Sequence, residues 1–205
     1  MEMFSKDFFK GYFSRNKKYF LISLSIFAFG FIFGAVINFI AIGSHYGELS
    51  AGLRNMSGIT VSDFGMDGLE LFIHNIKVDI ITIIGGLFFS IISLIVFFVN
   101  AFSIATPFGS DFTFAFVGIV PHGIFEYFAS VIALVAAFLI TRVEIDLIKS
   151  LRDKELTVRD VLSDSRPEIL DIVFSIILDV VLLVIAALIE ANITPRIMLW
   201  FYGIH

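Results

Sequence analysis

The chain has 205 residues, of which 58% are hydrophobic and 26 are phenylalanines, and its mean hydropathy is +0.96. Soluble domains are about 45–50% apolar, so this composition excludes a soluble globular protein and predicts a single integral membrane domain over residues 1–205. The absence of cysteine excludes disulfides and thiolate metal sites. The net charge of −5 carries little information for a chain buried in lipid, whereas the placement of its basic residues sets orientation.

The N-terminal region combines basic and aromatic residues. Residues 1–19 hold five Lys or Arg residues, a mixture that suits an interfacial arm on an anionic membrane face. The arm is either a docking element for partners or an ordinary topological anchor. The first span is predicted over residues 19–42, which exceed the ~20 residues needed to cross a bilayer and are too long for a signal-peptide core. Gly30 and Gly34 form a GxxxG pair on this span, which predicts close packing against an unidentified helix.

The middle of the chain predicts a helical hairpin. Residues 43–69 are rich in glycine and mildly acidic, as expected for an external loop. The apolar stretch that follows is too long for one straight span and is interrupted by Gly85 and Gly86. We interpret it as two membrane helices over residues 70–86 and 87–106, hinged at the glycine pair. An amphipathic surface segment followed by one span is the alternative.

The second half of the chain predicts two further spans. Residues 107–121 contain no Lys or Arg and their apolar part is too short to cross the bilayer. A re-entrant or interfacial segment fits there, which is permitted only where protein covers its backbone. Spans are predicted over residues 122–141 and 169–190, separated by a basic loop over residues 142–168. The expected fold is therefore an all-α polytopic helical bundle with about five spans.

Counting basic residues sets the expected orientation. The N-terminal arm has five Lys or Arg residues and the basic loop has six, whereas the external loop and the C-terminal tail have one each. The positive-inside rule then places the arm and the basic loop in the cytoplasm and the C-terminus outside a cell membrane. Within the basic loop, Thr157 and Asp160 form a capping-box pattern, which predicts a short helix. We expect Pro167 to end that helix.

One helical face near Pro121 carries two ionisable residues. His122 and Glu126 are four residues apart, so they lie one turn apart on the same face. Ionisable side chains inside a bilayer cost a few kcal/mol each or more, so they need partners and mark candidate functional sites. Ala129 and Ala133 continue this face, as expected where helices pack closely. Pro121 is expected in the first turn of the helix, with the helix dipole favouring a carboxylate at Glu126.

The last span carries a second polar stripe. Asp171 and Asp179 lie two helical turns apart, and Glu190 returns to nearly the same azimuth. This stripe is expected to face the bundle interior or a water-filled cavity. The other intramembrane polar candidates are His74, Asn75, Lys77, Asp79 and Asn100.

Three interpretations of these groups stay open. In the first, His122, Glu126, Glu190 and His74 gather in the outer half of the bundle and bind a divalent metal such as zinc, because imidazole and carboxylate suit that ion. In the second, the groups relay protons or cations across the membrane. In the third, they are buried hydrogen-bonded pairs that fix the helix register, among them a pair between Lys77 and a carboxylate.

Enzymatic signatures are missing from the sequence. It contains no His-Glu-x-x-His zinc-protease motif, no Gly-x-Ser-x-Gly elbow and no phosphate-binding loop. Asp171 and Asp179 share one helix and cannot face each other as an aspartyl dyad. We therefore expect a non-catalytic protein that has no nucleic-acid partner, and a metal-dependent membrane enzyme is the least favoured alternative.

Three blocks of residues, with Gly85 and Asn100 between them, carry a family resemblance. The blocks are Phe72-Ile-His-Asn75-Ile-Lys-Val78, Pro121-His122-Gly123-Ile-Phe-Glu126 and Ala186-Ala-Leu-Ile-Glu190-Ala191-Asn-Ile-Thr194-Pro195. Together they resemble the stage II sporulation protein M family of prokaryotic integral membrane proteins, over about residues 70–200. One departure is Ala101, where the family pattern has glycine after the asparagine.

The family is named for a protein that anchors a cell-wall-remodelling complex in sporulating bacteria. The resemblance therefore implies a membrane scaffold, expected to be a homo-oligomer, that assembles cytoplasmic or envelope partners in the lipid bilayer. It does not imply sporulation itself. A transporter or an ion or proton conduit that uses the buried His, Asp and Glu groups is the alternative.

Overall fold

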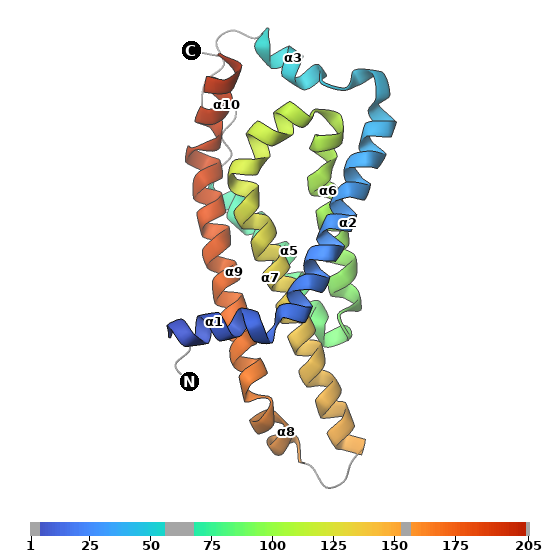
Figure 1. Ribbon diagram of the computed structural model, residues 1–205, viewed down its shortest axis with the longest axis vertical. Helices are drawn as coiled ribbons and strands as arrows, with labels where there is room; N and C mark the ends of the chain where they lie inside the picture. The colour runs from blue at the N-terminus through green and yellow to red at the C-terminus, as the bar shows by residue number, and fades with distance from the viewer. Residues whose placement is uncertain (1–4, 56–67, 153–156, 204–205) are drawn as a thin grey trace.

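The computed structural model describes residues 5–55, 68–152 and 157–203, and every regular element in these ranges is helical (Figure 1). Residues 56–67 of the external loop and 153–156 of the basic loop lie outside the described residues. Five helices are long and apolar enough to cross a membrane. They are α2 (Lys17–Ile42), α5 (Gly68–Ile84), α6 (Ile91–Ser110), α7 (Phe112–Arg152) and α9 (Arg166–Asn192). The predicted all-α polytopic fold is confirmed, and the chain is a multi-pass membrane protein.

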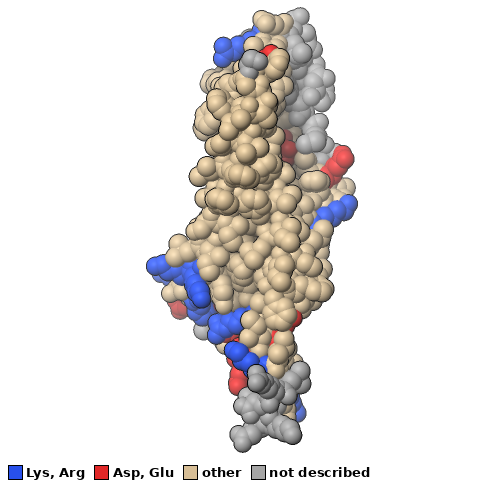
Figure 2. Space-filling view, turned by 90° about the vertical axis from the view of Figure 1, so that its right-hand side faces the viewer, with Lys and Arg blue, Asp and Glu red and all other residues tan. Residues whose placement is uncertain are grey.

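Shorter helices mark the two ends of the bundle. They are α1 (Lys6–Arg15), η1 (Gly43–His45), α3 (Glu48–Arg54), η2 (Gly85–Phe88), α8 (Val158–Asp164) and α10 (Thr194–Tyr202). In Figure 1, α1 crosses the bundle near its lower part and α8 lies at the lower tip, and we call this the basic end. The opposite end carries α3 and α10. Figure 2 shows a broad face without charged side chains, with Lys and Arg gathered below it toward the basic end.

Helices α2 and α6 pack together through glycines. A Cβ atom on Gly34 would overlap the carbonyl oxygen of Phe102, and one on Gly109 would overlap that of Ala35. Gly30 lies against the side chain of Ala101. Gly30 and Gly34 therefore mediate packing between two helices of the same chain, because they allow the backbones of α2 and α6 to approach closely.

Helix α7 is the centre of the bundle. Every residue from 129 to 137 is buried, with Ala129 and Ala133 fully so. These alanines bring α7 close to α9 and α5, which pack on it together with α6. The small-residue face of α7 thus lies at the contact that positions the polar side chains described below.

The hairpin between α5 and α6 turns close to the predicted glycine pair. Gly85 and Gly86 lie in η2. The two residues that follow η2, Phe89 (φ 53°) and Ser90 (φ 57°), adopt the left-handed backbone conformation. A Cβ atom on Gly86 would lie 2.6 Å from the carbonyl oxygen of Ala137. The glycines therefore permit close contact with α7, while the chain reverses just after them. The two-helix hairpin is confirmed, and its turn lies at Phe89 and Ser90, just after the predicted glycine pair.

Residues 107–121, expected to form a re-entrant or interfacial segment, are helical apart from Asp111. Helix α6 continues to Ser110 and α7 begins at Phe112. Pro121 accordingly lies inside α7 and not in its first turn. The helix N-terminus is thus distant from His122, and the expected dipole contribution there does not apply, since the dipole effect fades within the first turn.

The basic loop expected over residues 142–168 is largely helical. Helix α7 runs on to Arg152, and α8 starts at the predicted capping box, in which Thr157 and Asp160 each bond the other's backbone N–H. Pro167 lies in the first turn of α9, which begins at Arg166, and does not end α8. A proline fits there because the N–H it lacks would be unpaired in a first helical turn.

Asp111 ties three elements together at the opposite end. Its side chain accepts hydrogen bonds from Phe114 N (3.0 Å), Ser50 N (2.7 Å) and Ser50 Oγ (2.7 Å). Ser50 Oγ also lies 2.9 Å from the Tyr202 hydroxyl in α10. Burial alone acts to raise the pKa of Asp111, but the hydrogen bonds from Phe114 and Ser50 favour the carboxylate and hold the pKa below its ordinary value.

We expect Asp111→Asn to lower the free energy of unfolding at pH 7 by about 1–2 kcal/mol, because charge-assisted bonds and an N-terminal cap of α7 are lost. A carboxyl group whose pKa is lowered by folding stabilises the protein above its unfolded pKa of about 3.9, and that contribution disappears as pH falls through the folded pKa. Thermal unfolding in detergent at pH 7 and pH 3 measures this. The gap between wild type and variant should shrink at pH 3, and a gap that stays constant contradicts the prediction. Asp164→Asn, at an exposed site, is the control.

Candidate functional site

Polar side chains form a column between α5, α7 and α9. Helix α9 contributes Asp171, Ser175 and Asp179, all at most 2% exposed, and then the partly buried Glu190. At 1.5 Å per residue, Asp171 and Glu190 are about 28 Å apart along the helix, close to the ~30 Å thickness of the hydrocarbon core. The polar positions therefore extend over a length of α9 comparable to the thickness of the hydrocarbon core, at three levels.

The first level lies at the basic end, where α1 crosses α9 (Figure 1). Arg15 donates two hydrogen bonds to Asp171, Nη2 to Oδ1 at 2.6 Å and Nε to Oδ2 at 3.2 Å. Asn16 Nδ2 donates to the same carboxylate at 2.8 Å, and the Tyr12 hydroxyl lies 2.6 Å from Ser175 Oγ. The hydrogen bond to Asp171 raises the pKa of Arg15. We call these five residues the arm cluster.

The arm cluster was not predicted from the sequence. Phe8 and Tyr12 are 2% and 0% exposed, and their rings lie 5.3 and 4.9 Å from that of Phe174. The arm is thus packed on α9 in addition to any contact with lipid. Phe8, Tyr12 and Arg15 follow the i, i+4, i+7 spacing of one helical face, and that spacing was the available signal.

The second level is a pair of carboxyl groups deep in the bundle, which we call the carboxyl pair. Asp79 of α5 is 1% exposed and Asp179 of α9 is 0% exposed, and the two groups interact electrostatically. Ser130 Oγ donates to Asp79 Oδ1 at 2.9 Å. Asp79 and Asp179 share a side-chain hydrogen bond, which requires a proton on one of the two groups. Within the described residues, Asp79 Oδ2 and both Asp179 oxygens have no other hydrogen-bond partner. Two like charges side by side in a low-dielectric interior are unfavourable, so such a pair suits a bound proton or cation.

The third level brings His122, Glu126 and Glu190 together, and we call it the His–Glu cluster. One ligand atom from each residue lies within 4.8 Å of the other two. His122 is 5% exposed; its Nδ1 lies 3.2 Å from Thr194 Oγ1, and its Nε2 lies 3.6 Å from Glu190 Oε2. The Asn75 amide donates a hydrogen bond to Glu126. The arrangement offers one imidazole and two carboxylates to a single ligand.

A cavity reaches this level from the side of the bundle. Its volume is about 500 Å³ and its walls come from α5, α6, α7 and α9. Glu126 and Ser130 lie on its wall together with Asn100 and His74. Asn100 and the exposed His74 thus line the approach to the His–Glu cluster without joining it, so the structure leaves His74 out of the expected ligand set.

Lys77 does not have the expected role. Its side chain is exposed, and within the described ranges it forms no ion pair. Lys77 follows Asn75 by two positions in α5, so the two side chains point to different faces of the helix. The predicted pairing of Lys77 with a buried carboxylate is therefore wrong.

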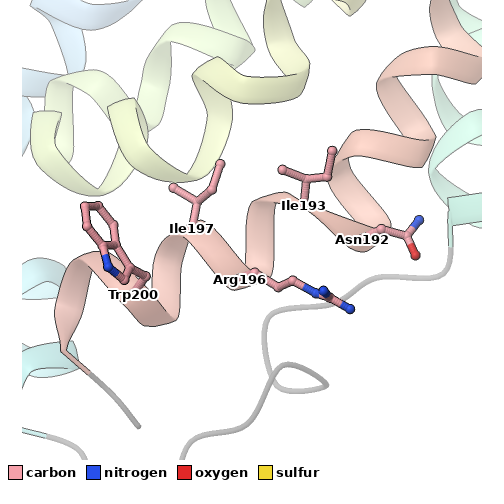
Figure 3. A pocket seen from close by; sticks show the side chains of 5 residues that line it. All are labelled: Asn192, Ile193, Arg196, Ile197 and Trp200. Atoms are coloured by element: carbon pink, nitrogen blue, oxygen red, sulfur yellow. The ribbon is translucent and has the colours of Figure 1, made fainter.

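A second recess, at the junction of α9 and α10, lacks convergent polar groups. It measures about 380 Å³ and is lined by Asn192, Ile193, Arg196, Ile197 and Trp200. Figure 3 shows Ile193, Ile197 and Trp200 along one side of the helix and Arg196 extending away from them. Trp200 is 76% exposed. Arginine and tryptophan are typical anchors at a membrane interface, so this recess carries no site.

Comparisons with known proteins cover two of the three levels of the column in full. A model of the family described as stage II sporulation protein M matches residues 23–195. The chain is 29% identical over 184 residues to an uncharacterized protein of Methanocaldococcus jannaschii, with 86% of this chain and 94% of that protein covered. No solved structure matches. The matched residues include the carboxyl pair and the His–Glu cluster, and they exclude the arm residues 12–16.

Proposed function

We propose that this chain, which belongs to the stage II sporulation protein M family, is a non-catalytic membrane scaffold that assembles partner proteins. The supporting observation is a helical projection at the basic end, made of residues 142–152 and 157–168. In Figure 1 the end of α7, α8 and the start of α9 extend beyond the rest of the bundle. Such a projection offers a rigid docking surface outside the lipid.

The projection carries charges of both signs at fixed positions. Arg142 and Glu168 form an ion pair at 3.1 Å that links α7 to α9. They lie on a groove of about 400 Å³ that is also lined by Asp146, Lys149 and Asp164. A mixed pattern of charges selects a partner with the complementary pattern and fixes its orientation. The proposed partner is therefore a polar protein segment.

The proposed orientation follows from the same end of the molecule. The arm and the projection hold most of the basic residues, so the positive-inside rule places both in the cytoplasm. The C-terminus then lies outside. Self-association is proposed as well, although Gly30 and Gly34 support it less than expected because α6 occupies their face.

Site-specific crosslinking in native membranes tests the scaffold. A photoreactive residue at Ile148, 48% exposed on the projection, is compared with one at Ile95, 60% exposed on the apolar surface of α6. We expect a discrete heavier adduct from position 148 only. Two differently tagged copies identify an adduct between two chains of this protein. If both positions yield monomer alone, the scaffold proposal fails.

A charge-reversal pair sharpens this test. Lys149→Glu places a fourth acidic group in the groove, so the adduct from position 148 should decrease. Arg159→Glu is the matched control, because Arg159 is exposed on α8 and does not line the groove. Equal adduct yields from the two variants would indicate that the groove does not select the partner.

The carboxyl pair favours a second candidate function, a proton or cation conduit. Buried carboxyl groups that pair with one another inside a membrane bundle are typical of proton and ion pathways. Proteoliposome flux of protons, sodium and divalent cations distinguishes this function from the scaffold. We expect Asp179→Asn and Glu126→Gln each to reduce flux, while Asp164→Asn leaves it unchanged. Flux that survives both buried substitutions together excludes the column as the pathway.

A further inference from the structure

We infer that His122, Glu126 and Glu190 bind one divalent cation of the zinc class inside the membrane, in the half of the bundle away from the basic end. This goes beyond a scaffold, since it assigns a ligand to the His–Glu cluster. The site joins two helices, because His122 and Glu126 belong to α7 and Glu190 to α9. A bound cation would therefore link the two helices.

Hydrogen bonds already orient the donor atoms. Thr194 lies beside Nδ1 of His122, which leaves Nε2 directed at Glu190. Asn75 donates to one oxygen of Glu126 and holds that carboxylate in place. Metal-binding histidines commonly bond their second ring nitrogen to an outer partner, and ligating carboxylates are bonded in turn. The His–Glu cluster has both features.

The distances are compatible with a small cation. Ligand bonds of about 2.0–2.2 Å in a tetrahedral arrangement place ligand atoms roughly 3.3–3.6 Å apart. The separation of 3.6 Å between His122 Nε2 and Glu190 Oε2 already matches this spacing, and it exceeds an ordinary hydrogen bond. The remaining ligand atoms lie within 4.8 Å. Binding would require these atoms to move about 1 Å closer together.

The charge balance also points to a cation. Glu126 and Glu190 bring two carboxylates together within the bundle, and within the described residues neither pairs with Lys or Arg. Buried charges are retained where they are paired or coordinate a metal. A divalent cation neutralises two carboxylates and leaves a neutral imidazole as the third ligand. The site would then carry no net charge in the membrane.

The donor set and its surroundings narrow the identity of the cation. Imidazole suits zinc and neighbouring transition metals, whereas magnesium and calcium prefer all-oxygen sites. Three protein ligands leave a fourth position, as in zinc sites that keep a water. The cavity beside Glu126 supplies a route for the ion and for that water.

Metal analysis of the purified full-length protein in detergent, without a histidine tag, tests the inference. After incubation with zinc and dialysis, we expect one zinc per chain. Glu126→Gln and Glu190→Gln should each weaken zinc affinity by more than tenfold, and Thr194→Val by about tenfold to hundredfold because it removes the partner of His122. His74→Gln should bind zinc like the wild type. Absence of stoichiometric zinc, or equal affinity in all four variants, overturns the inference.

A measurement on the wild type covers the case in which a variant fails to fold. Cobalt(II) replaces zinc, and X-ray absorption of the cobalt complex reports its ligands. We expect one imidazole nitrogen together with oxygen ligands. A shell of oxygen alone overturns the site, whatever the variants do. Crosslinking at position 148 is scored separately, so loss of the metal site and loss of the scaffold are distinguishable.

Discussion

Replacing Gly109 by alanine is expected to destabilise the protein more than the same change at any other glycine that the structure describes. The new Cβ would overlap the carbonyl oxygen of Ala35 and would also lie 2.8 Å from Asn38 Cβ. Backbone atoms cannot rotate out of the way as a side chain can, so α2 and α6 must separate. Overpacking of this kind costs about 1–3 kcal/mol and occasionally more. Thermal unfolding in detergent measures the effect.

The control for this variant is Gly52→Ala. Gly52 is also helical, in α3, but nothing lies within 4 Å of the position that a Cβ would take. Alanine favours helix over glycine by up to about 1 kcal/mol, so this variant should be as stable as the wild type or more so. Gly34→Ala combined with Gly109→Ala should be less than additive, since both separate the same helices. Similar midpoints for Gly52→Ala and Gly109→Ala would contradict the packing described for α2 and α6.

The second large effect is expected from Glu126→Gln. The amide preserves the size of the side chain, and Asn75 can still donate to it, so the packing of α7 should persist. The substitution removes the negative charge that faces His122 and Glu190. We expect complementation of a deletion strain to fall by at least about tenfold. Mutating the groups that support a metal site typically lowers metal affinity or activity by about this factor. A metal ion present at one hundred times its Kd should raise the free energy of unfolding of the wild type by about 2.7 kcal/mol. The same metal concentration should not stabilise the variant.

Glu70→Gln is the matched control. Glu70 is exposed in the first turn of α5, and it is the same residue type undergoing the same change. It should complement fully and respond to metal like the wild type. Equal, negligible effects of the two substitutions would show that the His–Glu cluster has no part in function.

Hydropathy and helical spacing predicted the membrane spans and the helical faces that carry the His–Glu cluster. Apolar length located the spans, because a bilayer leaves few alternatives to a continuous helix. The convergence of His122 and Glu126 followed from four-residue spacing, and the azimuth of Glu190 placed it on the buried face of α9. Which helix each face meets was not predictable, because contacts such as that of Gly34 with Phe102 depend on tertiary packing.

Two features eluded sequence analysis for physical reasons. A proline inside a helix removes a hydrogen bond, so Pro121 indicated a helix start. Membrane helices tolerate such prolines because their neighbours satisfy the freed groups, and α7 continues through it. The contact of Arg15 with Asp171 joins residues 156 positions apart. No local pattern predicts so distant a partner, although the spacing of Phe8 and Tyr12 was an available signal for the buried face of α1.

The docking of α1 on α9 also imposes an order on biosynthesis. Arg15 is made early, yet its partner Asp171 emerges only after 156 further residues, roughly 10–30 s later at ordinary rates of translation. Until the last span is inserted, Phe20 of α2 can cover part of the aromatic face of α1, but Phe8 and Tyr12 lack the Phe174 ring on which both pack. The arm can therefore complete its packing only after α9 has been inserted. A truncated product that lacks α9 leaves this face partly uncovered, a signal by which membrane proteases can recognise unfinished molecules.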